Sequence, residues 1–170
     1  MKIEIENELN ILLGLPLEDA GRSGNLVWFS FGKPLVIKNR NGTEKKAAEY
    51  ALNVQCSWRI TKENKILVAS SDIYMPSKQW NGVEEEFEWD IQGMNRFDEH
   101  IEKLIKNIQS QVFVESIQAD NIGGLKIFFT EHFLLELFPD ESTEDVEFWR
   151  IFIPGNISSH FVVMGKGIEN

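Results

Sequence analysis

The stretch YALNVQCSWRIT at residues 50–61 decides the fold class of this chain, because apolar and polar side chains largely alternate along it. One parity carries the apolar residues Tyr50, Leu52, Val54, Cys56, Trp58 and Ile60. Successive side chains of a strand point to opposite faces, so a period of two is typical of a strand with one buried face. We therefore predict a long strand over 49–61, with its apolar parity in the core and its other parity outside.

Part of this stretch recurs later in the chain. The tripeptide Trp-Arg-Ile occurs at 58–60 and again at 149–151, and a glycine turn with an apolar run lies upstream of each, at 24–29 and 123–129. A polar turn and a short apolar run follow each tripeptide. Self-similarity of this kind is typical of a repeated structural unit. We predict one domain over 1–170, with related β units at about 24–75 and 112–169.

Further apolar runs separated by turn residues predict strands at 26–31, 66–69, 112–119, 125–129, 133–138, 148–153 and 160–164. Asn41-Gly42 predicts a turn ahead of the long strand. Short strands divided by turn clusters favour antiparallel neighbours. The expected fold class is therefore mainly β (α+β), an antiparallel meander of the two related units.

One amphipathic helix is predicted in the middle of the chain. Asn95 can cap its first turn, and its apolar stripe consists of Phe97, Ile101, Leu104, Ile105 and Ile108. The preceding residues, 76–95, contain the acidic run at 84–86 and predict a long irregular connection. A short helical turn is expected near 9–13, ended by Gly14 and Pro16.

The composition excludes several classes of protein. The chain has 170 residues and a hydrophobic fraction of 42%, which indicates a folded protein with a substantial core. Its net charge of −10 argues against binding to nucleic acid or anionic membrane surfaces. Cys56 is the only cysteine, so no disulfide can form within the chain. The N-terminus lacks the pattern of a signal peptide, and we expect a cytoplasmic protein that does not enter membranes.

No motif for catalysis or for metal or cofactor binding stands out. The three histidines, His100, His132 and His160, lack the spacing typical of metal ligands. Cys56 shares the apolar parity of the long strand, which predicts a packed and unreactive thiol. The glycines around Arg22 lack the spacing of a phosphate-binding loop and predict a turn. We therefore predict no catalytic residue, no metal site and no cofactor.

Only Arg59 and Arg150 suggest a binding site. Each lies on the opposite parity from its tryptophan, so both face outward if the tryptophans are buried. In one interpretation each arginine forms an ion pair with a nearby glutamate and is structural. In the other, both arginines act with His132 and His160 as ligand-binding residues between the two units. Glu136 is expected to point to the solvent side of its strand.

Several strings of the chain resemble a family of small bacterial proteins of unknown function. They are LPL at 15–17, GR at 21–22, EYALNVQCSWRI at 49–60, VESI at 114–117, GGL at 123–125, LELFPD at 135–140, WR at 149–150 and HFVV at 160–163. The resemblance covers most of the chain except the region around 76–95, and it implies no reaction or ligand. A looser similarity, in the strand–turn–Trp-Arg–strand pattern alone, is to small bacterial domains suspected of acting as immunity proteins.

Acidity, the lack of a catalytic motif and this resemblance favour a non-enzymatic binding protein of the immunity type, which neutralises a protein partner by surface contact. The alternative is an enzyme or small-ligand binder that uses the two arginines and two histidines named above. A homodimer formed through a sheet edge or an apolar face is a third expectation. No binding to nucleic acid is expected.

Overall fold

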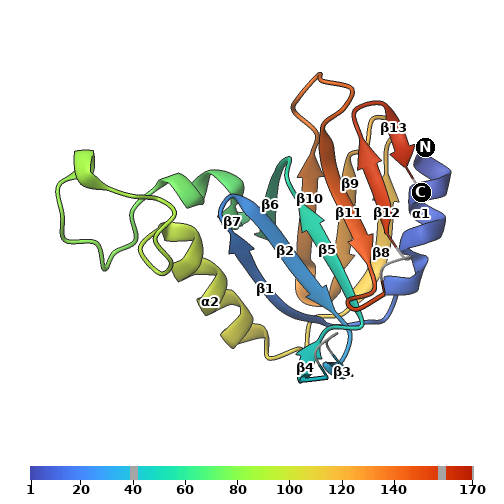
Figure 1. Ribbon diagram of the computed structural model, residues 1–170, viewed down its shortest axis with the longest axis horizontal. Helices are drawn as coiled ribbons and strands as arrows, with labels where there is room; N and C mark the ends of the chain where they lie inside the picture. Colours follow the sequence, from blue (N-terminus) through green and yellow to red (C-terminus); the bar gives the residue numbers. More distant parts are fainter. Residues whose placement is uncertain (39–41, 157–159, 170) are drawn as a thin grey trace.

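Two antiparallel sheets pack face to face and bury the apolar parity of their strands (Figure 1). The computed structural model describes residues 1–38, 42–156 and 160–169. The six-stranded sheet has the order β1 (Leu17–Ser23), β2 (Leu26–Phe31), β5 (Tyr50–Val54), β11 (Glu147–Phe152), β12 (Phe161–Met164) and β13 (Gly167–Glu169). The five-stranded sheet has the order β7 (Lys65–Ala69), β6 (Ser57–Lys62), β10 (Phe133–Phe138), β9 (Leu125–Phe129) and β8 (Val114–Ala119). A separate hairpin consists of β3 (Leu35–Lys38) and β4 (Glu44–Ala47). The expected mainly β (α+β) class with antiparallel sheets is confirmed.

The stretch at 50–61 forms two strands rather than the single strand predicted. β5 ends at Val54 and β6 begins at Ser57, and the chain passes from one sheet to the other at Gln55 and Cys56. The apolar parity stays buried through this crossing, except for the half-buried Tyr50. Because the inner faces of both sheets contact the same core, a strand that crosses between them needs no change of pattern. The alternation therefore predicts burial correctly but does not reveal the corner.

The other predicted strands are present, with ends shifted by at most two residues. Four strands go beyond the prediction: β1, β3, β4 and β13. β1 reads LEDAGRS, and a bulge near its start interrupts the alternation of its buried residues Leu17, Ala20 and Arg22. β13 is only three residues long. Of the predicted turn at 41–42, Asn41 lies outside the described residues.

The predicted central helix is present as α2 (Arg96–Ile108). The side-chain oxygen of Asn95 accepts a hydrogen bond from the Asp98 N–H (2.9 Å), which caps the first turn. The helix ends at Gln109, whose backbone is left-handed (φ 46°). α2 packs against β1 and β7, the edge strands on one side of the sandwich.

A second helix, α1 (Lys2–Leu9), leads into a 3₁₀ turn (Asn10–Leu12) and begins well before the short turn predicted near 9–13. Its buried residues Ile5 and Leu9, followed by Leu12, keep the spacing i, i+4, i+7 of a helical stripe. α1 packs against β8, on the side of the sandwich opposite to α2 (Figure 1). None of the helices in the described residues is long and apolar enough to cross a membrane.

The two halves of the chain follow the same path through the sandwich. In the first half, α1 is followed by β1, β2 and β5 of the six-stranded sheet and then by the β6–β7 hairpin of the five-stranded sheet. In the second half, α2 is followed by β8, β9 and β10 of the five-stranded sheet and then by the β11–β12 hairpin of the six-stranded sheet. Each sheet thus combines strands from both halves. The similar path begins at the helices, ahead of the units predicted at 24–75 and 112–169. That the two halves arose by duplication stays a prediction.

The segments that lead into β1 and β8 pair with each other in a nearly symmetric way. Pro16 and Phe113 face each other across an isolated antiparallel bridge. β1 and β8 each have a bulge close to their first residue. Matching backbone hydrogen bonds flank the bridge: Leu17 N–H to Val112 O (2.9 Å) and Val114 N–H to Leu15 O (3.0 Å). The backbone at this contact therefore has the local twofold symmetry of an antiparallel bridge.

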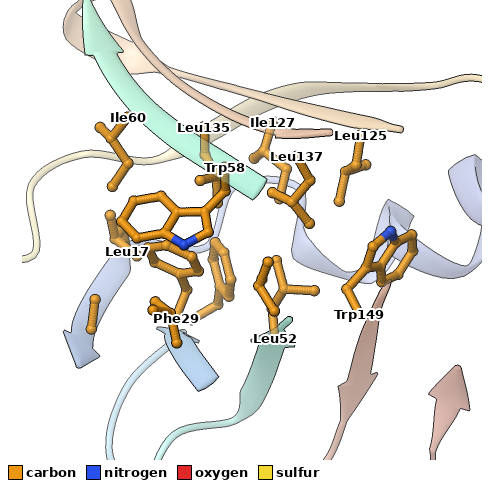
Figure 2. Close-up of a cluster of buried hydrophobic side chains, with 14 of the residues drawn as sticks. Leu17, Phe29, Leu52, Trp58, Ile60, Leu125, Ile127, Leu135, Leu137 and Trp149 are labelled. Carbon is orange, nitrogen blue, oxygen red and sulfur yellow. The ribbon is translucent and has the colours of Figure 1, made fainter. Parts of the chain in front are cut away.

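Trp58 on β6 and Trp149 on β11 both lie in the core between the sheets (Figure 2). Trp149 is fully buried, and its indole N–H donates a hydrogen bond to the Gly123 carbonyl (2.8 Å). The ring of Trp58 instead meets Phe29 and Phe97 edge to face, at 5.3 and 5.8 Å between centroids. Both tryptophans are core residues, so the arginine that follows each of them faces outward, as parity predicts.

Candidate functional site

The connection between the two halves projects from the sandwich as a long loop (Figure 1). Residues 77–94, called here the acidic loop, contain five acidic side chains and one lysine, a net charge of −4. The irregular connection predicted over 76–95 is confirmed, apart from a 3₁₀ turn (Glu84–Glu86). Much of the negative charge of the chain is therefore concentrated on one projecting segment.

Backbone pairing closes the acidic loop at its neck. Pro76 and Asn95 form an isolated antiparallel bridge, and Asn95 is fully buried. The Asn95 side chain also donates a hydrogen bond to the Trp89 carbonyl (2.8 Å). Two backbone hydrogen bonds flank the bridge: Ser77 N–H to Met94 O (2.9 Å) and Arg96 N–H to Met75 O (2.7 Å). Hydrogen bonds therefore join the two ends of the loop where it leaves the sandwich.

A buried ion pair holds this base against the sandwich. Arg22 on β1 and Asp98 on α2 form two parallel contacts, Nε to Oδ1 at 2.7 Å and Nη2 to Oδ2 at 2.8 Å. Their side chains are 1% and 6% exposed. Asp98 also accepts a hydrogen bond from the Gly93 N–H (2.7 Å), and Arg22 donates to the Ile91 carbonyl (3.2 Å). Buried charges need such additional partners, and here the backbone of the loop supplies them.

Sequence reasoning missed both members of this pair. Arg22 was expected in a glycine turn, but it lies within β1 on the parity that faces the core. Asp98 lies at a position in the first helical turn where acidic residues are common. The sequence therefore does not reveal its ion pair with Arg22. A signal does exist, because an arginine on the buried parity of a strand needs an acidic partner. The sequence alone does not say which acid that is.

Aromatic side chains pack within the acidic loop and at its neck. Trp80 meets Phe87 edge to face at 5.6 Å, and Trp89 meets Tyr74 in the same way at 5.3 Å. Gly82 lies so close to Trp80 that an added Cβ would be 2.4 Å from the indole ring. The absence of a side chain at this position thus allows the tryptophan to fold back over the loop. These contacts give the loop a small apolar interior of its own.

The outer surface of the acidic loop and its neck combines apolar with acidic side chains. Four apolar residues are between 41% and 56% exposed: Tyr74, Met75, Val83 and Ile91. Four acidic residues are exposed in the same segment: Glu85, Glu86, Glu88 and Asp90. Exposed apolar groups bordered by charged ones are typical of surfaces that bind another protein. The loop is therefore the first candidate for an interaction site.

Arg59 lies on the outer face of the five-stranded sheet in a row of three charged residues. In the strand pairing, Glu136 stands between Arg59 and Lys126. Arg59 Nε donates to Glu136 Oε2 at 2.6 Å, and Lys126 Nζ lies 3.4 Å from Glu136 Oε1. Glu136 therefore points to the outer side of its strand, as expected, but it is only 5% exposed in this row. The ion pair expected in the structural interpretation of Arg59 is present.

Burial disfavours the charged form of Glu136, but the hydrogen bond and positive charge of Arg59, with Lys126 beside it, hold the pKa of this carboxyl below its ordinary value of 4.5. A carboxyl with a lowered pKa in the folded state stabilises the fold at pH values above its unfolded pKa. This contribution is lost as the pH falls through the folded pKa.

We therefore expect Glu136→Gln to lower the free energy of unfolding at neutral pH by about 1–2 kcal/mol, because the two cations lose their shared partner but stay half exposed. The loss should be smaller at an acid pH below the lowered folded-state pKa of this carboxyl, where the wild-type side chain has also lost its charge. Urea unfolding at both pH values measures this difference. Glu115→Gln, at an exposed position of β8, is the control. An equal loss at both pH values would contradict the assignment.

Arg150 lies on the outer face of the six-stranded sheet and contacts two side chains. Its Nε and Nη2 both donate to the carboxylate of Glu147, with Nε 2.6 Å from Oε1. Its Nη1 lies 3.1 Å from Nδ1 of His160, whose ring stacks on Phe152 (4.8 Å between centroids). The hydrogen bond with Glu147 raises the pKa of Arg150. Because arginine can only donate, the His160 Nδ1 acts as acceptor in this contact.

The four residues predicted to bind a ligand do not gather in one place. Arg150 and His160 contact each other, whereas Arg59 belongs to the other sheet. Since both arginines face away from the core, they lie on opposite outer surfaces of the sandwich. His132 is exposed in the turn before β10, with a left-handed backbone (φ 60°). A single pocket between the sheets therefore cannot hold both arginines.

Cys56 lies at the crossing between β5 and β6 and is 9% exposed. Burial, together with the nearby Asp140 carboxylate, raises the pKa of the Cys56 thiol to about 12. Such a thiol stays protonated at neutral pH, and the predicted packing of Cys56 in the core is confirmed. Across residues 1–38, 42–156 and 160–169, no group of three or more His, Cys, Asp or Glu side chains is placed to hold a metal ion.

No family model matches this chain, and comparisons with curated proteins and with solved structures give no match either. The resemblance to small bacterial proteins therefore stays an expectation that rests on the strings quoted for it. The features that point to function are those of the molecule itself, above all the acidic loop.

Proposed function

We propose that this chain is a non-enzymatic binding protein of the immunity type, which docks a basic protein partner through the acidic loop. The observation that carries the proposal is the joint exposure of acidic and apolar side chains on a projection that is fixed at its base. Val83 and Ile91 are about half exposed there, although nothing in the packing of the sandwich requires them to be. Contact with a partner would remove this apolar surface from water.

The charge of the loop defines the chemistry of the partner. Five acidic residues on one segment repel each other in the free protein, and basic side chains of a partner would relieve this repulsion. Opposite charges also attract over a distance, which speeds association and orients the two proteins before contact. A protein with a basic cleft, such as one that acts on nucleic acid, has the complementary charge.

The anchoring of the loop favours tight binding. The neck and the Arg22–Asp98 pair hold the loop in place before any partner arrives. The aromatic contacts of Trp80 with Phe87 add order inside it. A surface that is already ordered loses less conformational entropy on binding than a mobile one. The acidic loop therefore has the properties of a preformed interaction surface.

The triple variant Glu85→Lys, Glu86→Lys and Glu88→Lys tests this proposal, because it reverses three exposed charges without touching the neck. We expect the affinity for the partner to fall by at least about tenfold at low salt and to lose much of its salt dependence. The partner is captured from source cells at low salt, identified and purified, and both forms are then titrated by calorimetry. A toxin encoded beside this chain is the first candidate partner.

The matched control reverses three exposed charges elsewhere: Glu115→Lys, Glu141→Lys and Glu144→Lys. It should leave the affinity within about threefold of the wild type, because these residues lie outside the proposed surface. Equal weakening by both triple variants would show that only net charge matters and would contradict docking by the loop. Failure to recover any stable protein partner at low salt would count against the function as a whole.

The alternative function, an enzyme or small-ligand binder based on Arg59, Arg150, His132 and His160, has less support. Arg59 and His132 lie apart from the Arg150–His160 contact, and both arginines are engaged by glutamates. Self-association through a sheet edge stays a prediction, which sedimentation at several concentrations can test.

A further inference from the structure

The outer face of the six-stranded sheet has a groove whose lining includes no residue of the acidic loop. Its volume is about 570 Å³, within the range of roughly 300–1,000 Å³ that is typical of small-molecule sites. Its floor contains outward-facing residues of β2, β5 and β11: Trp28, Ser30, Asn53 and Phe152. Lys45 and Lys46 of β4 line it from the side of the β3–β4 hairpin.

The outer faces of the two sheets differ at matching positions. On the five-stranded sheet, paired neighbours form the closed ion row of Arg59, Glu136 and Lys126. The residues that occupy the matching places on the six-stranded sheet are Arg150, Asn53 and Trp28. Asn53 thus stands where the other half has a glutamate, and Arg150 bonds to Glu147 instead.

The hairpin beside the groove also has no counterpart in the second half. β2 and β5 are separated by the whole β3–β4 hairpin, whereas β9 and β10 are joined by a 3₁₀ turn (Thr130–His132). The second half shows that this path through the sandwich does not need a hairpin at that point. The hairpin is therefore an addition to the path that both halves follow through the sandwich, and it borders the groove.

Three residues that line the groove carry polar side-chain groups. The Trp28 indole N–H, the Ser30 hydroxyl and the Asn53 amide make no side-chain hydrogen bond to any residue that the structure describes, and all three residues are half buried. Trp28 lies so close to Gly21 that an added Cβ would be 2.6 Å from the indole ring, which fixes the ring against β1. A few polar groups in a mainly apolar groove are typical of sites that orient a small ligand.

The charge beside the groove is opposite to that of the whole chain. Two lysines of β4, Lys45 and Lys46, line the groove, whereas the whole chain has a net charge of −10. Lys45 and Lys46 are exposed. Glu18 and Asp19 also line the groove, at some distance along the chain from the two lysines. The hairpin therefore favours an anionic group at its side of the groove.

We propose that this groove binds a small anion that carries a planar, hydrogen-bonding ring, which is the chemistry of a nucleoside monophosphate. The ring packs against the aromatic floor provided by Trp28 and Phe152. Ser30 and Asn53 form hydrogen bonds with the edge of the ring, and Lys45 and Lys46 bind the phosphate. The site is independent of the acidic loop, so either proposal can fail without the other.

The test is a titration of the purified full-length chain with AMP, GMP, CMP and UMP, followed by tryptophan fluorescence and calorimetry. We expect at least one of them to bind with a Kd below about 1 mM. The matching nucleoside and inorganic phosphate should each bind at least about tenfold more weakly, because each offers only part of the contacts. If none of the four binds with a Kd below about 1 mM, the proposal is overturned.

Two variants separate the parts of the site. Lys45→Glu with Lys46→Glu should weaken binding of the nucleotide at least about tenfold and leave the nucleoside unchanged, whereas Asn53→Ala should weaken both. Lys62→Glu with Lys65→Glu, an equal charge change on the β6–β7 hairpin, is the control and should have no effect. Equal weakening by the two lysine pairs would overturn the site. Thermal unfolding of each variant confirms that it is folded.

Discussion

Asp98→Asn is expected to lower the free energy of unfolding by about 3–5 kcal/mol, the largest effect of any polar substitution proposed for this chain. The change keeps the size of the side chain but leaves the positive charge of Arg22 buried without a counter-charge. Arg22 is 1% exposed, so water cannot take the place of the lost carboxylate. Urea unfolding at neutral pH, followed by circular dichroism, measures the loss.

Two further variants are compared with Asp98→Asn. Arg96→Gln breaks a half-exposed pair, Arg96 with Asp72 at 3.7 Å, and should cost less than about 1 kcal/mol. The double variant Arg22→Met with Asp98→Leu removes both charges and should be more stable than Asp98→Asn. Asp98→Asn should also increase proteolytic cleavage within residues 77–94, because the pair anchors the base of the acidic loop. A cost no greater than that of Arg96→Gln would contradict the anchoring role.

Trp149→Ala is expected to lower the free energy of unfolding by about 3–5 kcal/mol, because it removes a fully buried aromatic ring from the centre of the core. Part of this effect comes from the indole N–H, which bonds to the Gly123 carbonyl at 2.8 Å. Trp149→Phe keeps most of the ring but leaves this carbonyl without its partner, and it should cost about 1–3 kcal/mol. Urea unfolding of both variants separates packing from hydrogen bonding.

The matched residue in the other half of the chain is the control. Trp58 occupies the corresponding strand, but its ring makes edge contacts with Phe29 and Phe97 instead. Trp58→Phe should therefore cost less than Trp149→Phe. If Trp58→Phe proves as costly as Trp149→Phe, the hydrogen bond to Gly123 does not make the difference between the two sites.

The period-two pattern at 50–61 predicts the fold class and the buried parity, because alternation depends only on which face of a strand meets the core. It does not predict the corner at Gln55 and Cys56, since the same parity faces inward in both sheets. The stripe of Phe97, Ile101 and Leu104 likewise predicts α2. α1 escapes prediction because acidic residues surround Ile5 and Leu9 in a short helix.

The candidate sites depend more strongly on contacts between distant residues. The acidic run at 84–86 and the irregular connection around it are visible in the sequence, but the anchoring of that connection by Arg22 is not. The groove depends on the pairing of Trp28 with Asn53 and of Ala51 with Phe152, on strands that are far apart in the chain. No local pattern contains that information. The predicted set of Arg59, Arg150, His132 and His160 rested on residue type, and only Arg150 and His160 come together.

The interleaving of the two halves also determines when the protein can fold. β5 and β6 are inner strands of the two sheets, and each depends on a strand made later: Leu52 pairs with Ile151, and Ile60 pairs with Leu135. While the chain is being synthesised, the first half emerges with both of these strand edges unpaired and its inner faces uncovered. Closing such long loops is slow, and open edges can meanwhile pair with other chains. The sandwich is therefore completed only after the last strands leave the ribosome, and the nascent first half is the stage at which this protein is most exposed to aggregation.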